Sequence, residues 1–129
     1  MAIIQVIGSL IKNPTLLLED NYTLRTSDFP ERFHQIIFSA IYNLINTGIK
    51  ELDIITIDNY ISQYEKQYVV FNSNNGVQYL EGCIELANVR NFKYYYDRLR
   101  KFALLKTLNE KGFDIKEIYD DSLIDVKMQ

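Results

Sequence analysis

SDFPERFHQIIFSAIYNLINTG, residues 27–48, is the stretch that decides the fold of this 129-residue chain. Its apolar side chains are spaced as on one face of an α-helix, at Phe33, Ile36, Ile37, Ala40, Ile41 and Leu44. Ser27 or Asp28 offers a side-chain oxygen to the free amides of a helix start, and Pro30 suits the first turn. Gly48 is a typical stop signal. The stretch therefore predicts a long amphipathic helix that starts at Ser27 or Asp28 and ends at Gly48.

Helices are also expected on both sides of this stretch. Residues 3–11 show the same spacing, and Asn13-Pro14 ends that helix before a short apolar segment at 16–18. Downstream, residues 53–56 are expected to form a brief extended link, in which Thr56 caps the next helix. The inner face of that helix consists of Ile57, Tyr60, Ile61 and Tyr64.

Residues 68–76 are expected to lie outside the helices. Residues 68–71 suit a strand by propensity, but the chain offers no partner strand, so we interpret them as a loop. Asn72-Ser73-Asn74-Asn75-Gly76 is a strong turn signal. Another helix then follows at Val77, Leu80, Ile84 and Ala87.

The longest helical pattern occupies the C-terminal part of the chain. It consists of Phe92, Tyr95, Leu99, Phe102, Leu105, Leu108, Gly112, Ile115 and Tyr119. This stripe continues for about eight turns, which is longer than a domain of this size, so its far end is expected to project. The predicted fold is all-α, a compact bundle of about six helices. Residues 1–90 would form a globular head, 91–119 the long helix, and 120–129 the start of a further helix.

The composition leaves little room for catalysis. Cys83 and His34 are the single cysteine and histidine, and no phosphate-binding loop or metal-ligand motif occurs. We therefore expect neither an enzyme nor a metal or cofactor site in this chain. The apolar stretch 1–18 is too short and too interrupted to span a membrane, and a single cysteine suits a cytoplasmic protein.

Positive charge is concentrated in one window of an acidic chain. Residues 90–111 carry a net charge of +5, whereas the whole chain carries −3. The candidate contacts to nucleic acid or to an acidic partner are Arg90, Lys93, Arg98, Arg100 and Lys101. Tyr94, Tyr95 and Tyr96 lie among them and could stack on bases. The alternative is a basic helix face that docks on an acidic surface of the same domain or of a neighbour.

The order of these motifs resembles the N-terminal domain of the DnaB-type replicative helicases. Residues 2–14 resemble that family's opening helix, roughly A-x-x-x-L-G-x-x-L-x-x-P, with one additional residue between Ala2 and Gly8. Residues 28–48 match D-F-x-x-x-x-H-x-x-I-F-x-A-I-x-x-L-x-x-x-G, and residues 76–80 match G-x-x-Y-L. The resemblance covers about residues 2–119. Pro30 departs from it, because the family usually has an aromatic residue after D-F.

The resemblance implies a non-catalytic collar domain. In that family, such domains form dimers and a ring of three dimers, and the C-terminal domain of primase docks on them. The long helix would be the first arm of a helical hairpin, and residues 120–129 would begin the second arm or linker. ATP, Mg²⁺ and most DNA contacts would belong to a motor domain that is absent from this chain.

The resemblance also suggests which residues make these contacts. The primase-docking candidates are Tyr79, Leu105 and Leu108. The self-association candidates are Phe92, Tyr96, Leu99, Ile115 and Ile118. Two alternatives stay open: the helicase-binding domain of a primase, which resembles the collar in fold, and a stand-alone nucleic-acid-binding or loader-type replication regulator.

Overall fold

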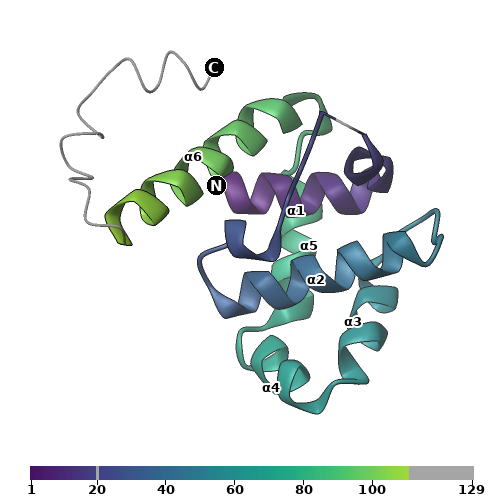
Figure 1. The fold of residues 1–129 in the computed structure, drawn as a ribbon. Helices are drawn as coiled ribbons and strands as arrows, with labels where there is room; N and C mark the ends of the chain where they lie inside the picture. The colour runs from purple at the N-terminus through teal and green to yellow at the C-terminus, as the bar shows by residue number, and fades with distance from the viewer. Residues whose placement is uncertain (20, 111–129) are drawn as a thin grey trace.

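The computed structural model describes residues 1–19 and 21–110, which form six α-helices and three short 3-10 helices (Figure 1). The α-helices are α1 (Ala2–Lys12), α2 (Arg32–Asn46), α3 (Ile54–Ser62), α4 (Glu65–Ser73), α5 (Gly76–Leu86) and α6 (Phe92–Glu110). The 3-10 helices are η1 (Pro14–Leu18), η2 (Thr26–Asp28) and η3 (Val89–Asn91). No strand occurs in the described residues, and the predicted all-α fold is confirmed. The predicted stripe beyond residue 110 and the predicted helix start at Asp120 lie outside them.

Helix α1 is the central helix of the fold. α1 contacts α5, α6 and α2, and its residues 5–11 are all buried. It approaches α5 closely because Gly8 has no side chain; a Cβ at this position would overlap the carbonyl group of Cys83. Cys83 is itself buried, as expected for a small apolar side chain. Figure 1 shows α6 at one end of the molecule and the α3–α4 pair at the other.

The body of α2 matches its prediction, but its start does not. Phe33, Ile37 and Ile41 are buried, and Gly48 ends the segment with a φ of +94°. The helix begins at Arg32, however, and neither Ser27 nor Asp28 caps it.

The predicted start at Asp28 is wrong because the carboxylate of that residue is engaged elsewhere. Asp28 accepts hydrogen bonds from the backbone N–H of Arg25 and from Arg100, and residues 26–28 form a separate 3-10 turn. Phe29 is then extended and fully buried, stacked on Phe38 with 4.9 Å between ring centroids. Because Phe29 is extended and buried in the core, α2 begins only after it, at Arg32.

Two further local predictions are corrected. Asp53 caps α3, since its Oδ1 accepts from the backbone N–H of Thr56 at 2.7 Å, so Thr56 lies inside the helix. Residues 68–71 belong to α4 rather than to a loop, and Phe71 is the buried anchor of that helix. Gly76 makes room for it, because a Cβ there would overlap the Phe71 ring. The predicted turn before α5 is shorter than expected and centres on Asn75, whose φ is 55°.

Candidate interaction surfaces

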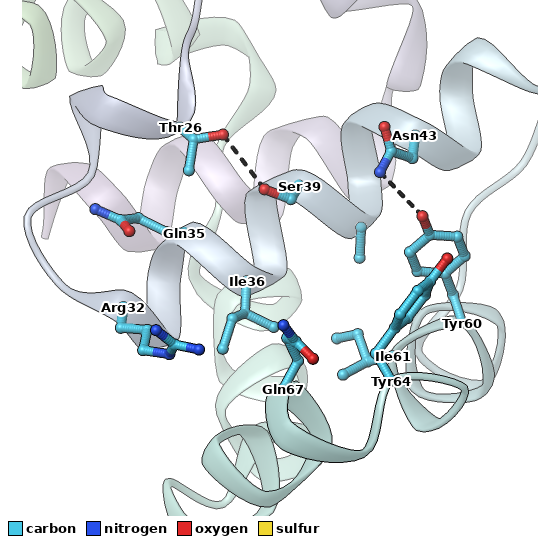
Figure 2. Close-up of a pocket in the computed structure, with 11 residues that line it drawn as sticks. Thr26, Arg32, Gln35, Ile36, Ser39, Asn43, Tyr60, Ile61, Tyr64 and Gln67 are labelled. Atoms are coloured by element: carbon cyan, nitrogen blue, oxygen red, sulfur yellow. Dashed lines mark hydrogen bonds between the residues drawn. The ribbon is translucent and has the colours of Figure 1, made fainter.

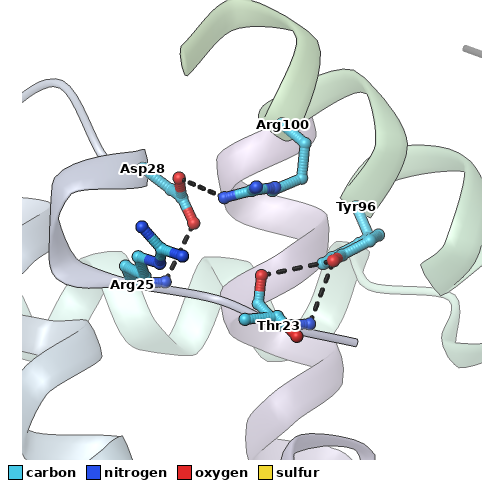
Figure 3. A network of polar contacts seen from close by, with 5 residues as sticks. All are labelled: Thr23, Arg25, Asp28, Tyr96 and Arg100. Atoms are coloured by element: carbon cyan, nitrogen blue, oxygen red, sulfur yellow. Dashed lines mark hydrogen bonds and ion pairs between the residues drawn. The ribbon is translucent and has the colours of Figure 1, made fainter. Parts of the chain in front are cut away.

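The base of α6 is fastened to the head by aromatic and polar contacts. Tyr22 meets the Phe92 ring edge-on at 4.8 Å and the Tyr96 ring at 5.0 Å. The Tyr96 hydroxyl accepts from the backbone N–H of Thr23 at 2.9 Å and donates to the Thr23 carbonyl at 3.2 Å (Figure 3). The Tyr96 hydroxyl therefore satisfies both the backbone N–H and the backbone carbonyl of Thr23, which lies in a segment without regular secondary structure.

One turn further along α6, an ion pair continues this attachment. Arg100 Nη1 donates to Oδ1 of Asp28 at 2.7 Å, and the Asp28 side chain is only 4% exposed (Figure 3). The other carboxylate oxygen accepts from the N–H of Arg25 at 2.8 Å. The buried carboxylate is thus both charge-paired and hydrogen-bonded, which compensates its desolvation.

The self-association candidates are placed mainly inside the chain's own head. Phe92 and Leu99 are each 2% exposed, and Tyr96 is half-buried against Thr23. Ile115 and Ile118 lie outside the described residues. Among the described side chains of α6, residues 92–105, the large apolar ones exposed to solvent are Tyr94, Phe102 and Leu104, with exposed fractions of 54%, 48% and 49%.

The predicted apolar stripe includes Phe102 but neither Tyr94 nor Leu104. Leu99 and Leu105 flank Phe102 in the same stripe and are buried, so the head covers α6 only in part. Tyr94, Phe102 and Leu104 lie on different sides of α6, so they form no periodic pattern in the sequence. Only the position of the head against α6 reveals them.

The primase-docking candidates do not form one patch in the described part of the chain. Tyr79 is half-buried on α5, with its ring 5.0 Å from Phe33 and 5.4 Å from His34. Leu105 is 3% exposed on α6, which does not contact α5 in this part of the chain. Leu108 is within α6, but its side chain lies outside the described residues.

Burial shapes the chemistry around Tyr79. It raises the pKa of the Tyr79 hydroxyl above its usual range, and a hydrogen bond links this group to Cys83. Burial also raises the pKa of the Cys83 thiol to about 11, so the thiol stays protonated and unreactive at neutral pH. The described residues hold no group of three or more His, Cys, Asp or Glu side chains that could bind a metal ion.

The basic residues of α6 are partly neutralised within the chain. Besides the Arg100 pair, Lys93 contacts Asp97 at 2.8 Å, which raises the pKa of the lysine. Arg98 lies over the Tyr94 ring at 5.7 Å, and Lys101 is half-buried. Arg90 is exposed on η3. For Arg100, the structure supports the alternative in which a basic side chain docks on an acidic group of the same domain.

A groove that the sequence did not indicate lies between α2 and the α3–α4 pair (Figure 2). Its volume is about 360 Å³, and its lining comes from both sides of the bend between α3 and α4. The lining combines apolar side chains, two tyrosines, amides and one arginine. These residues come from η2, α2, α3, α4 and the link between α3 and α4, so no local motif could have revealed them.

Comparisons with known proteins place these features in context. The profile described as the DnaB-like helicase N-terminal domain matches residues 4–101. The SPbeta prophage-derived uncharacterized protein YorI of Bacillus subtilis strain 168 is 52% identical over 129 residues. That alignment covers 99% of this chain and 26% of YorI, so the chain spans about a quarter of this curated relative. No solved structure matches significantly. No helix in the described part of the chain is both long and apolar enough to cross a membrane.

Proposed function

Because the chain belongs to the family of DnaB-like helicase N-terminal domains, we propose that it is the non-catalytic assembly and docking module of a replicative DNA helicase. The ATP- and Mg²⁺-dependent motor and most of the DNA contacts would lie in another part of a longer cytoplasmic protein. The family match across residues 4–101 carries this proposal. It favours the helicase side over the alternative of a primase domain with a similar fold.

Self-association through α6 is the first part of the proposed function. The base of α6 is held to the head by the Tyr96–Thr23 and Arg100–Asp28 contacts, which sets the direction in which the helix leaves the head. Phe102 and Leu104 remain about half exposed on this anchored helix. Because they are two positions apart, they lie on opposite sides of α6, and each side offers one exposed apolar side chain to a neighbouring helix.

Sedimentation equilibrium over a range of concentrations tests this pairing. We expect a dimer, and we expect Phe102→Ser with Leu104→Ser to shift it to monomer. Leu86→Ser is the matched control, because Leu86 is 52% exposed but lies at the end of α5. A monomer at every concentration, or equal weakening by the Leu86 variant, would contradict self-association through α6.

Primase docking is the second part, and it is centred on Tyr79. The ring is held between Phe33 and His34 while part of it reaches the surface, as is common for tyrosines at protein interfaces. We expect the C-terminal domain of the cognate primase to bind, and Tyr79→Ala to weaken binding by about tenfold or more. Tyr79→Phe keeps the ring and should bind nearly normally. Isothermal titration that detects no binding to the unmodified chain would exclude docking.

A nucleic-acid-binding regulator is the second candidate function, supported by the exposed Arg90 and Arg98. Fluorescence anisotropy with single-stranded DNA distinguishes it from the first. Binding through these cations would weaken steeply as salt is raised, and the double variant Arg90→Gln with Arg98→Gln would lower the affinity. No binding at low salt would dismiss this candidate.

A further inference from the structure

The groove between α2 and the α3–α4 pair has an apolar floor and an ordered aromatic end. Ile36 of α2 and Ile61 of α3 form part of the floor, and Ile61 is 2% exposed. Tyr60 and Tyr64 stand at one end with 5.5 Å between ring centroids, and Asn43 donates to the Tyr60 hydroxyl at 2.9 Å (Figure 2). Because these rings are already positioned, a ligand would lose little side-chain entropy in using them.

The opposite end of the groove carries a positive charge without a compensating partner. Arg32, the first residue of α2, is exposed, and no ion pair within the described residues involves it. The neighbouring Glu31 is directed to His34, with 3.9 Å between Oε2 of Glu31 and Nδ1 of His34. Figure 2 shows Arg32 at this end and Gln67 further along the groove, between Arg32 and the two tyrosines. The guanidinium can hold a carboxylate in a forked pair of hydrogen bonds, and the amide can hydrogen-bond to a second polar group of the same ligand.

We propose that this groove binds a short acidic segment of a partner protein. A carboxylate of the segment pairs with Arg32, and a neighbouring apolar side chain lies on Ile36 and Ile61 against the Tyr64 ring. Gln67 hydrogen-bonds to the backbone of the segment beside that apolar side chain. The proposal follows from charge complementarity, because a forked guanidinium matches a carboxylate in geometry. Arginine and tyrosine are also the residue types that contribute most to binding at interfaces.

A peptide fits the groove better than a nucleic acid does. Binding to a phosphate backbone relies on several cations, whereas the lining of this groove offers Arg32 alone. An apolar floor next to a single charge instead suits a side-chain pair of an acidic, apolar peptide. The volume of about 360 Å³ is at the lower end of the range for ligand pockets, enough for a few side chains.

The groove is independent of the proposed self-association and primase docking. It lies on the α2–α4 side of the molecule, away from α6 (Figure 1), and Tyr79 does not line it. A second protein could therefore occupy the groove while α6 is paired. If self-association through α6 or primase docking at Tyr79 were disproved, the inference about the groove would still stand. Disproof of peptide binding in the groove would likewise leave those two proposals unaffected.

Selection from a random peptide display library, with the whole chain as bait, tests the inference. We expect the enriched peptides to contain Asp or Glu near an aliphatic or aromatic residue. Fluorescein-labelled versions of these peptides would then be titrated by anisotropy against the chain and its variants. Arg32→Glu should weaken binding by about tenfold or more, and Tyr64→Ala by severalfold.

Arg90→Glu is the matched control, because it reverses an exposed charge outside the groove. It should leave the affinity within about twofold, since Arg90 lies on η3, which contributes no residue to the lining of the groove, and salt screens charges that do not contact the ligand. Equal binding by the Arg32→Glu variant would overturn the inference, as would enriched peptides without acidic residues. Displacement of the peptides by oligothymidine would overturn it in favour of a nucleic-acid ligand. Circular dichroism melting confirms that each variant is folded.

Discussion

Asp28 and Arg100 lie 72 positions apart in the sequence and form an ion pair of 2.7 Å that connects the segment before α2 to α6. The aspartate side chain is 4% exposed and the arginine side chain 36%. The carboxylate also accepts from the backbone N–H of Arg25. One residue thus orders the irregular segment 25–29 and sets the position of the long helix.

Asp28→Ala and Arg100→Ala are each expected to lower the free energy of unfolding by about 1–3 kcal/mol. Arg100→Ala leaves the buried Asp28 carboxylate without its charge partner, and Asp28→Ala removes the acceptor of both Arg100 and the Arg25 N–H. The double variant should cost less than the sum, with a coupling of at least about 0.5 kcal/mol. Urea denaturation of the four proteins measures both quantities. Strict additivity would mean that the pair does not act as a unit in solution.

This pair also explains the limits of prediction from sequence. The body of α2 could be predicted, because burial of one helical face leaves a periodic pattern at Phe33, Ile37 and Ile41. The start of the helix could not, because the residue that looked like its cap is engaged by a side chain from the other end of the chain. Capping rules identify a side chain that can accept from the first amides of a helix. They do not show that a distant residue, here Arg100, already occupies the Asp28 carboxylate.

The other discrepancies have related causes. α4 buries only Phe71, so it leaves almost no periodic pattern, and the sequence of residues 68–71 does not distinguish a helix from a loop. Phe102 follows the α6 stripe but is 48% exposed, because the head covers only part of that helix. The groove near Arg32 draws on three helices, and sequence periodicity does not report how separate helices meet. The resemblance to the helicase family, in contrast, used ordered motifs and is confirmed by the family match.

Gly8→Ala is expected to destabilise the chain by about 1–3 kcal/mol or more, because the added methyl group would force α1 away from the Cys83 carbonyl of α5. Gly82→Ala is the matched control within a helix. A Cβ at Gly82 would meet nothing within 4 Å, so this variant should gain up to about 1 kcal/mol from helix propensity. Thermal melting followed by circular dichroism compares them. Equal behaviour of the two variants would refute the close approach of α1 and α5.

Asp53→Ala should cost about 1 kcal/mol, because it removes the N-cap of α3. Thr56→Ala should cost less, since the Thr56 backbone N–H and not its side chain is the capped group. Urea denaturation ranks the two variants, and a larger loss for Thr56→Ala would favour the cap that the sequence suggested.

The same cap has a pH dependence of predictable sign. The hydrogen bond from the Thr56 backbone lowers the pKa of Asp53 in the folded state. The stabilisation is therefore complete above the usual aspartate pKa and is lost as the pH falls through the lower folded value. Asp53→Asn keeps an acceptor but cannot titrate, so its cap should contribute equally across this range. A parallel decline in both proteins between about pH 5 and pH 3 would argue against a titrating cap.

His34 should make the stability fall as the medium becomes mildly acidic. Its side chain is 12% exposed beside Phe33 and Tyr79, and its buried Nδ1 has no hydrogen-bond partner in the described structure. Burial lowers its pKa, while Glu31 opposes the shift. The unfolded chain therefore takes up a proton near pH 6.5 that the folded chain resists, so the free energy of unfolding declines as the pH falls below about 6.5.

Urea denaturation at a series of pH values between about 7.5 and 5.5 measures this decline, in a window that carboxylates hardly enter. The chain has a single histidine, so His34→Phe should remove most of the slope. Glu31→Gln should steepen it, because the opposing negative charge at 3.9 Å is lost. A slope that survives His34→Phe would assign the effect to another group, and a flatter slope in Glu31→Gln would reverse the role inferred for the carboxylate.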